Sequence, residues 1–300
     1  MKTYLEISSA GKNDWWRYIL SVFFILFMWF FVGSIPLLIL ITILTLNGTP
    51  PELISANGIS SAAPLWNFIA TVASFLPLFI SIPLAIRFIH KRPMQTIITP
   101  AKSIHWRRIF NSFAVWFFLS GIITFIEALL YPGRYIFSMD LPKLLPFLIA
   151  TLLLIPFQSS AEEFFFRGFL LQWVGLKLKN RLALSLISGL LFALPHILNP
   201  EVSVDFWLTM SFYFIFGVFA AWVTLKDNGL ELALGMHAAN NIYACIFANY
   251  SKGVLQTPAF FTTNQLDASY NLAATAVSIL IFYFVFFQPW KAAKKELELI

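Results

Sequence analysis

Apolar runs long enough to cross a lipid bilayer recur along this chain of 300 residues, and no other feature restricts its fold as strongly. An α-helix needs about 20 apolar residues to cross roughly 30 Å of hydrocarbon. Eight runs of suitable length lie at about 18–46, 65–89, 109–131, 144–171, 181–198, 206–225, 231–249 and 270–290.

The composition agrees with a membrane protein, since 59% of the residues are hydrophobic and only 11% are charged. The longest stretches outside the runs, at about 47–64, 90–108 and 250–269, are too short to form a separate domain. The sequence therefore predicts an all-α, polytopic integral membrane protein of about eight transmembrane helices. We expect residues 1–300 to form a single membrane domain.

Lysine and arginine are distributed unevenly between the two sides that eight spans define. With both termini inside, 17 of the 20 fall on the cytoplasmic side, and only Arg134, Lys143 and Lys252 fall outside. This bias predicts a multi-pass protein of the cell membrane with its N- and C-termini in the cytoplasm. Basic loops that face an anionic inner leaflet also account for the net charge of +6 without any nucleic-acid partner.

Two of the prolines inside the predicted spans, and the single cysteine, carry specific expectations. The run 144–171 is too long for one straight crossing, and Pro156 is its expected break. Pro195 precedes His196 and is expected to kink its helix at the histidine, which would open space or free a carbonyl group. Cys245, the single cysteine, is expected to pack within a helix.

Three charged residues interrupt the fourth apolar run. Glu162, Glu163 and Arg167 are the only charged residues between Lys143 and Lys177. Each costs roughly 2.5–3.5 kcal/mol on the insertion scale unless it is paired or hydrated. Glu163 and Arg167 are four residues apart, so they share a helix face and are expected to form an ion pair. Glu162 points about 100° away and has no remaining cation, which indicates a functional role.

Histidines and asparagines occur in two later spans. His196 lies in FALPHIL one turn after Phe192, and His237 lies in HAANN with Asn240 and Asn241. The side chains of His237 and Asn241 can project toward one point because they are four residues apart. Lys179 lies midway between Glu162 and His196, so a helical hairpin that turns there places those two side chains at one membrane depth.

These groups together allow hydrolysis of an amide. A carboxylate and a neutral imidazole can take a proton from water, and a second histidine with an amide N–H can stabilise the resulting oxyanion. No serine, cysteine or lysine is clearly placed beside a base, although Ser159 and Ser160 lie close by, so attack by water is favoured over an acyl-enzyme. Zinc bound by Glu162, His196 and His237 is the alternative.

Four further polar residues carry weaker expectations. Glu127 and Asn67 lie in predicted spans and are interpreted either as supporting groups near the site or as interfacial residues. His90 and His105 flank basic clusters and are interpreted as interface anchors.

Three motifs resemble those of the CAAX-protease and bacteriocin-processing family, also called the Abi family. EEFFFR, FALPH and HAANN match, in order and spacing, the family patterns EExxxR, FxxxH and HxxxN. The resemblance covers about 144–250. It implies an intramembrane endopeptidase of eight helices whose site lies in a cavity within the bilayer, and whose substrate is a membrane-associated peptide or protein.

The resemblance also implies roles for individual residues. Glu162 would activate water with help from His196, and His237 and Asn241 would form the oxyanion site. Family members have been described as metalloproteases and as metal-independent glutamate peptidases. We expect no required cofactor, because an oxyanion role suits Asn241 better than metal ligation does. The residues expected to support the architecture are Glu163, Arg167, Phe192 and Asn240.

Two other classes of function remain open. Some family members are described as partners of other proteins rather than as enzymes. A non-catalytic membrane partner in bacteriocin immunity or signalling is therefore the first alternative. A proton-coupled transporter is the second, because intramembrane carboxylates and histidines also build proton relays. The absence of an internal repeat in the sequence weakens this second reading. A bacterial origin is expected from the resemblance.

Overall fold

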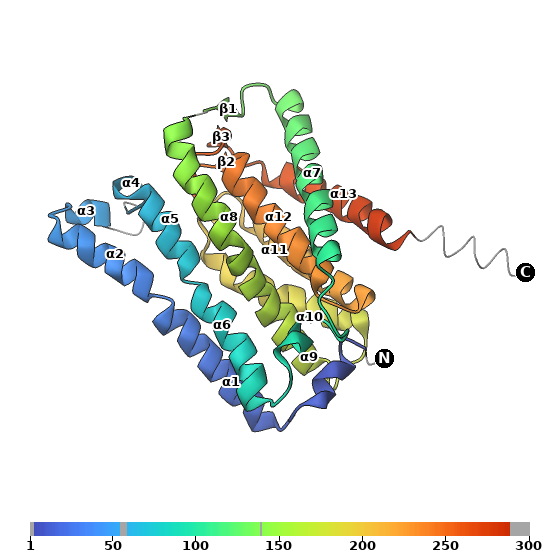
Figure 1. Ribbon diagram of the computed structural model, residues 1–300. Helices are drawn as coiled ribbons and strands as arrows, with labels where there is room; N and C mark the ends of the chain where they lie inside the picture. The colour runs from blue at the N-terminus through green and yellow to red at the C-terminus, as the bar shows by residue number, and fades with distance from the viewer. Residues whose placement is uncertain (1–2, 55–58, 139, 289–300) are drawn as a thin grey trace, which may run out of the picture.

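The computed structural model describes residues 3–54, 59–138 and 140–288, which form a bundle of long helices with a small sheet at one end (Figure 1). The α-helices are α1 (Trp15–Phe27), α2 (Ile35–Leu46), α3 (Pro51–Ile54), α4 (Ile59–Ala62), α5 (Pro64–Ala73), α6 (Leu76–Leu84), α7 (Trp106–Leu130), α8 (Leu141–Glu163), α9 (Leu171–Val174), α10 (Arg181–Ala193), α11 (Phe206–Asp227), α12 (Glu231–Ile246) and α13 (Ala268–Phe287). The strands are β1 (Ile136–Phe137), β2 (Ala248–Tyr250) and β3 (Phe261–Thr263).

Short turns of other helical types link or extend these helices. The π-helical turns are Met28–Val32, Ala85–Ile89 and Phe164–Leu170. The 3-10 turns are Glu6–Ala10, Met94–Ile97, Leu194–Leu198 and Pro200–Ser203.

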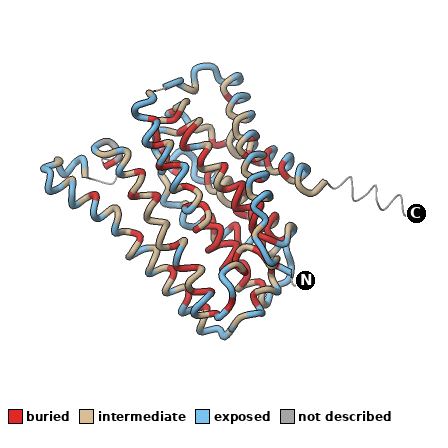
Figure 2. The backbone as a smooth tube through the Cα atoms, in the orientation of Figure 1, coloured by how far each residue is buried: buried red, intermediate tan, exposed pale blue. Residues whose placement is uncertain are grey.

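Seven segments of the described chain are long and apolar enough to cross a membrane, which confirms an all-α, polytopic membrane protein. They are Trp15–Leu46, Pro64–Ile89, Trp106–Leu130, Leu141–Val174, Arg181–Leu198, Phe206–Asp227 and Ala268–Phe287. The seventh predicted run, at about 231–249, instead forms α12, a helix of only 16 residues. At 1.5 Å per residue it is about 24 Å long, shorter than the hydrocarbon core. Most of its residues are buried (Figure 2), so its apolar character serves packing inside the bundle.

Helix α12 nevertheless carries the chain from one end of the bundle to the other. It runs parallel to α7, because Glu231 at its start accepts a hydrogen bond from the backbone of His105, and Tyr243 near its end packs on Phe117. We call the end with residues 90–105, 175–180 and 226–230 the inner end, and the end with the sheet the outer end. The described termini both lie at the inner end.

Two contacts place those termini. The backbone N–H of Tyr4 donates to the Asn228 side chain, and the Lys226 ammonium lies 5.1 Å from the ring centre of Tyr283 in the last helix. The lysine and arginine bias likewise predicts that both termini lie on the same side of the membrane. That bias predicts that the inner end faces the cytoplasm. The basic residues after residue 290 lie outside the described residues.

The outer end is closed in part by the sheet and an ion-pair cluster. The strand order is β1-β3-β2, with β1 antiparallel and β2 parallel to β3. Arg134, which precedes β1 in the chain, lies 2.7 Å from Glu127 and 3.4 Å from Asp267, so it connects α7 to the start of α13. The Tyr135 hydroxyl donates to the second Glu127 oxygen at 2.6 Å. Glu127 therefore belongs to the outer cap rather than to the group around Glu162.

The inner end is sealed by tight packing. Tyr4 is 1% exposed, and its hydroxyl donates to the Ile97 carbonyl at 2.5 Å and lies 3.2 Å from the Arg167 carbonyl. A Cβ on Gly168 would lie only 2.4 Å from the Ile97 side chain, so only glycine lets these segments approach so closely. The Arg92 guanidinium donates to the Gln172 side chain across the same interface. The N-terminal segment and residues 92–98 thus form a continuous plug.

His90 belongs to this plug, which corrects its interpretation as an interface anchor. It is 1% exposed, its Nδ1 lies 3.0 Å from the Lys12 carbonyl, and its Nε2 lies 3.1 Å from the Ser21 hydroxyl. A carbonyl can only accept, so Nδ1 carries the proton and Nε2 accepts from Ser21. His105, by contrast, is exposed and lies 3.3 Å from the Glu231 carboxylate, which suits its predicted surface position.

We expect the plug to weaken in mild acid through His90. Burial lowers the pKa of His90 to about 4, so the unfolded chain takes up a proton there first as the pH falls below about 6.5. The stability contributed by the neutral ring is complete above that pH and is lost toward pH 4, by up to about 1.4 kcal/mol per pH unit. Thermal unfolding in detergent between pH 4 and 7.5 should show a shallower slope for His90→Gln than for wild type. Parallel curves would contradict this assignment.

The fourth run departs from a straight helix at a different place from the one predicted. Pro156 lies inside the continuous helix α8 and does not break it. The irregularity follows Glu163 instead, where Phe164–Leu170 form a π-helical turn. Cys245 is buried, as expected, in an apolar cluster with Ile242.

Candidate active site

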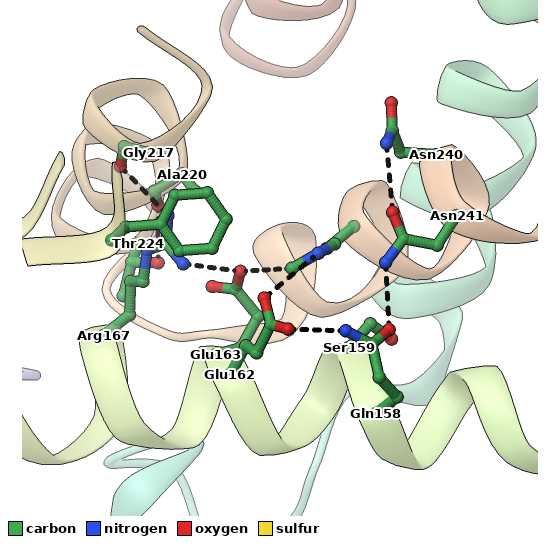
Figure 3. Close-up of polar contacts among 12 residues, drawn as sticks. Gln158, Ser159, Glu162, Glu163, Arg167, Gly217, Ala220, Thr224, Asn240 and Asn241 are labelled. Atoms are coloured by element: carbon green, nitrogen blue, oxygen red, sulfur yellow. Dashed lines mark hydrogen bonds and ion pairs between the residues drawn. The ribbon is translucent and has the colours of Figure 1, made fainter. Parts of the chain in front are cut away.

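Glu163 and Arg167 form the ion pair that their spacing predicts. Both side chains are fully buried, and the Arg167 guanidinium donates to Glu163 Oε1 at 2.9 Å. A second guanidinium nitrogen donates to the Gly217 carbonyl at 3.2 Å, and the guanidinium carbon lies 4.2 Å from the ring centre of Phe192 (Figure 3). The pair thereby joins the end of α8 to α10 and α11.

Close contact between α10 and α11 makes that junction possible. A Cβ on Gly217 would lie 2.9 Å from the Cα of Gly189, so the two helices meet through their glycines. This approach brings the Gly217 carbonyl within reach of Arg167 and places the Phe192 ring over its guanidinium. Phe192, predicted only to support the architecture, lies at the centre of the site and also packs edge-on against His237 with ring centres 5.8 Å apart.

The structure places His237 between the two glutamates. Its Nδ1 lies 2.8 Å from Glu163 Oε1, and its Nε2 lies 3.7 Å from Glu162 Oε2. The Glu163 carboxylate is held as an anion by Arg167, so Nδ1 is the protonated nitrogen and donates to it. The Nε2 atom is then left facing Glu162. A separation of 3.7 Å is too long for a direct hydrogen bond between these two atoms.

The two oxygens of Glu162 have different surroundings. Oε1 accepts a hydrogen bond from the Gln158 amide at 2.5 Å. Oε2 is buried and has no hydrogen-bond partner among the residues that the structure describes. A buried oxygen of this kind is costly to leave unsatisfied. The structure thus presents one carboxylate oxygen that is fixed by the protein and one that is free for a ligand.

Amide side chains lead to Glu162 in a continuous series (Figure 3). The Trp116 indole donates to Asn240, Asn240 donates to Asn241, and Asn241 donates to the Gln158 oxygen at 2.9 Å. Each donor in the series points toward Glu162, so the series ends on Oε1 of that carboxylate. Sequence reasoning missed Gln158, although its position one turn before Glu162 was a usable signal.

His196 lies just after the end of helix α10, four residues beyond Phe192. Helix α10 ends at Ala193 and a 3-10 turn that contains Pro195 follows, as the predicted kink requires. The Phe192 carbonyl accepts from His196 Nδ1 at 2.7 Å, so Nε2 is an acceptor here too. The imidazole lies 4.1 Å from the Tyr213 ring, measured between ring centres.

One cavity of about 470 Å³ joins these residues. The polar residues of the site that line it are Gln158, Glu162, His196, His237, Asn240 and Asn241. The volume is in the range of small-ligand sites. Glu162 and His196 line the same cavity, as the predicted helical hairpin requires.

The residues proposed for zinc do not form a metal centre in this structure. Across residues 3–54, 59–138 and 140–288, no three histidine, cysteine, aspartate or glutamate side chains lie close enough together to hold a metal ion. His237 Nδ1 is already engaged by Glu163, and Nε2 is the one nitrogen of that ring left for a ligand.

Gln158 is expected to act as a positioning residue. The change Gln158→Leu keeps the size of the side chain but removes the hydrogen bonds to Glu162 and Asn241. Displacement of a reacting group by about 1 Å can lower a rate about 10²-fold, so we expect kcat to fall by that order while KM changes little. Peptide-cleavage kinetics would measure it. The matched control is Gln172→Leu, because Gln172 is equally buried but contacts Arg92 and Thr96 in the plug. Equal loss of kcat in both variants would argue against the assignment.

The chain matches known proteins over the segment that carries the site. A family described as type II CAAX prenyl endopeptidase Rce1-like matches residues 142–243, which include α8, α10, α11 and most of α12. The uncharacterized protein YyaK of Bacillus subtilis (strain 168) is 34% identical over 275 residues, which cover 91% of each chain. The resemblance inferred from the three motifs is confirmed, and the chain belongs to the Rce1-like CAAX prenyl endopeptidase family.

Proposed function

We propose that this protein is an intramembrane endopeptidase that hydrolyses a peptide bond of a membrane-associated peptide or protein by attack of water. The observation that supports it most directly is Glu162 Oε2, which has no hydrogen-bond partner among the described residues and lies 3.7 Å from Nε2 of His237, a second residue of the cavity lining. A water molecule between two acceptors can donate a hydrogen bond to each and is thereby made more nucleophilic.

In this mechanism Glu162 is the general base. It takes one proton from the water as the water oxygen bonds to the carbonyl carbon of the substrate. The tetrahedral intermediate collapses with cleavage of the C–N bond, and the proton passes to the leaving nitrogen. His237 assists because its Nδ1–H is held by the anionic Glu163, an arrangement that orients the ring and stabilises a transient positive charge on it.

The amide groups supply the oxyanion site. Asn241 uses one of its two N–H bonds on Gln158, so the second can donate to the negative oxygen of the intermediate. His196 presents Nε2 as an acceptor from the same cavity wall, which suits a role in receiving a proton. Water attack rather than an acyl-enzyme also agrees with Ser159, whose hydroxyl is engaged by the Ile155 carbonyl.

Cleavage of a peptide library in oxygen-18 water tests the proposal. Purified protein in detergent would be incubated with short hydrophobic peptides, with and without a chelator. We expect internal cleavage with one labelled oxygen in each new carboxylate, unchanged by the chelator. Loss of cleavage in chelator would show that a metal is needed, and no cleavage by wild type of any peptide would favour a non-catalytic membrane partner.

A further inference from the structure

Along the bundle axis, the lining of the cavity extends from the glutamates toward the outer end, and Trp29 and Phe75 line it at the side. On α7 its lining begins at Trp116 and continues through Ser120 to Glu127, about 16 Å along the axis and close to the outer end of the helix. On α11 and α13 the lining residues likewise come from the outer halves, for example Thr209 and Asn271.

The outer limit of the cavity is built by the sheet and the loops beside it. Strand β2 contributes its three residues, and the connections on either side of it and of β3 contribute Leu255 and Gln265. Tyr135 and Asp267, from the ion-pair cluster at the outer end, line it as well. These segments connect the helices at the outer surface of the protein.

The inner direction is closed by packed side chains. Directly below the site, Arg167, Phe169, Leu232 and Met236 are all fully buried. Helix α12 lies against α7 so closely here that a Cβ on Gly235 would be 2.1 Å from the Ile109 carbonyl. The plug formed by the N-terminal segment and residues 92–98 lies beneath this layer.

We infer that the cavity is entered from the extracytoplasmic side, so that the substrate of the proposed peptidase is a polypeptide segment displayed on the outer face of the membrane. At the outer end the lining includes the exposed residues Val254 and Gln265, so the cavity reaches the surface there. The inference combines this observation with the lysine and arginine bias, which predicts that the inner end faces the cytoplasm. The substrate class rests on the proposed function, whereas the direction of access does not.

Four serine-to-cysteine variants test the direction without any activity measurement. They would be made in a Cys245→Ala background, because Cys245 is the single cysteine of the chain. Ser120 lines the cavity, and Ser112, two turns below it on α7, is fully buried. Ser251 is exposed at the outer end and Ser103 is exposed at the inner end. Each variant would be treated in right-side-out and in inside-out membrane vesicles with a charged, membrane-impermeant methanethiosulfonate.

We expect Ser120→Cys and Ser251→Cys to be modified in right-side-out vesicles and Ser103→Cys only in inside-out vesicles, while Ser112→Cys stays unmodified in both. Modification of Ser120→Cys only from the inside would overturn the inference. Modification only by an uncharged, membrane-permeant reagent would overturn it too, because it would show access from the lipid. Reversed labelling of Ser251→Cys and Ser103→Cys would overturn the orientation. A peptidase-inactive protein that labels as expected would refute the proposed function and leave the direction of access standing.

Discussion

Replacing Glu162 by glutamine is expected to lower kcat/KM for peptide cleavage by about 10²–10⁴-fold, the range attributed to general base catalysis. Glutamine has the same shape and can still accept the hydrogen bond that Gln158 donates to Oε1. It cannot take a proton from water. Because the change also removes a buried carboxylate oxygen that has no partner in the described structure, the protein should be at least as stable as wild type.

The matched control for this prediction is Glu231→Gln. Glu231 is 2% exposed, close to the 6% of Glu162, but lies at the inner end of α12, outside the cavity lining. Its carboxylate accepts from the His105 backbone, and glutamine can do the same. We expect this variant to keep its cleavage rate. Steady-state cleavage and thermal unfolding would be measured on both variants, and a Glu162→Gln enzyme within tenfold of wild type would contradict the general-base assignment.

The second large effect is expected on stability, when one partner of the Glu163–Arg167 pair is removed. Both side chains are fully buried, so Glu163→Gln leaves an uncompensated guanidinium and Arg167→Met leaves an uncompensated carboxylate. Breaking a buried pair in this way typically costs about 3–5 kcal/mol. We expect each single variant to accumulate poorly in the membrane and to unfold at a clearly lower temperature in detergent.

A double-mutant cycle separates the pair from its other contacts. The double variant Glu163→Gln/Arg167→Met buries no charge at this place, so it should recover a large part of the stability lost by either single variant. Arg167→Lys should be intermediate, because lysine keeps the charge but loses the forked contact to Glu163 and the Gly217 carbonyl and the planar contact with Phe192. Strictly additive losses in the cycle would show that the two charges are not energetically coupled.

The same pair connects stability to chemistry through His237. Glu163 accepts from both Arg167 and His237, so it fixes the tautomer of the imidazole whose Nε2 faces Glu162. The proposed catalytic carboxylate and the structural carboxylate are neighbours in the chain but contact opposite nitrogens of one ring. A division of roles between adjacent glutamates was predicted from their angular separation on the helix, and their partners in the structure agree with it.

Local rules were sufficient for the membrane class, for most spans and for the Glu163–Arg167 pair. Span length and lysine and arginine bias depend only on nearby residues and on the bilayer. An i, i+4 pair depends only on the helix that carries it. The prolines show where such rules stop. A 3-10 turn that contains Pro195 follows α10, where a kink was predicted, whereas α8 continues through Pro156, where a break was predicted.

By itself, then, the sequence determined that the chain crosses the membrane many times, which motif residues belong together, and that Glu162 lacks a cation of its own. Only the tertiary structure decided that His237 rather than His196 lies beside Glu162, that Gln158 supports it, that α12 is a short interior helix, and that the cavity runs toward the outer end. These features depend on how closely helices distant in sequence approach each other. That approach is set by glycine contacts such as the one between Gly189 and Gly217, which no periodicity within a single helix reveals.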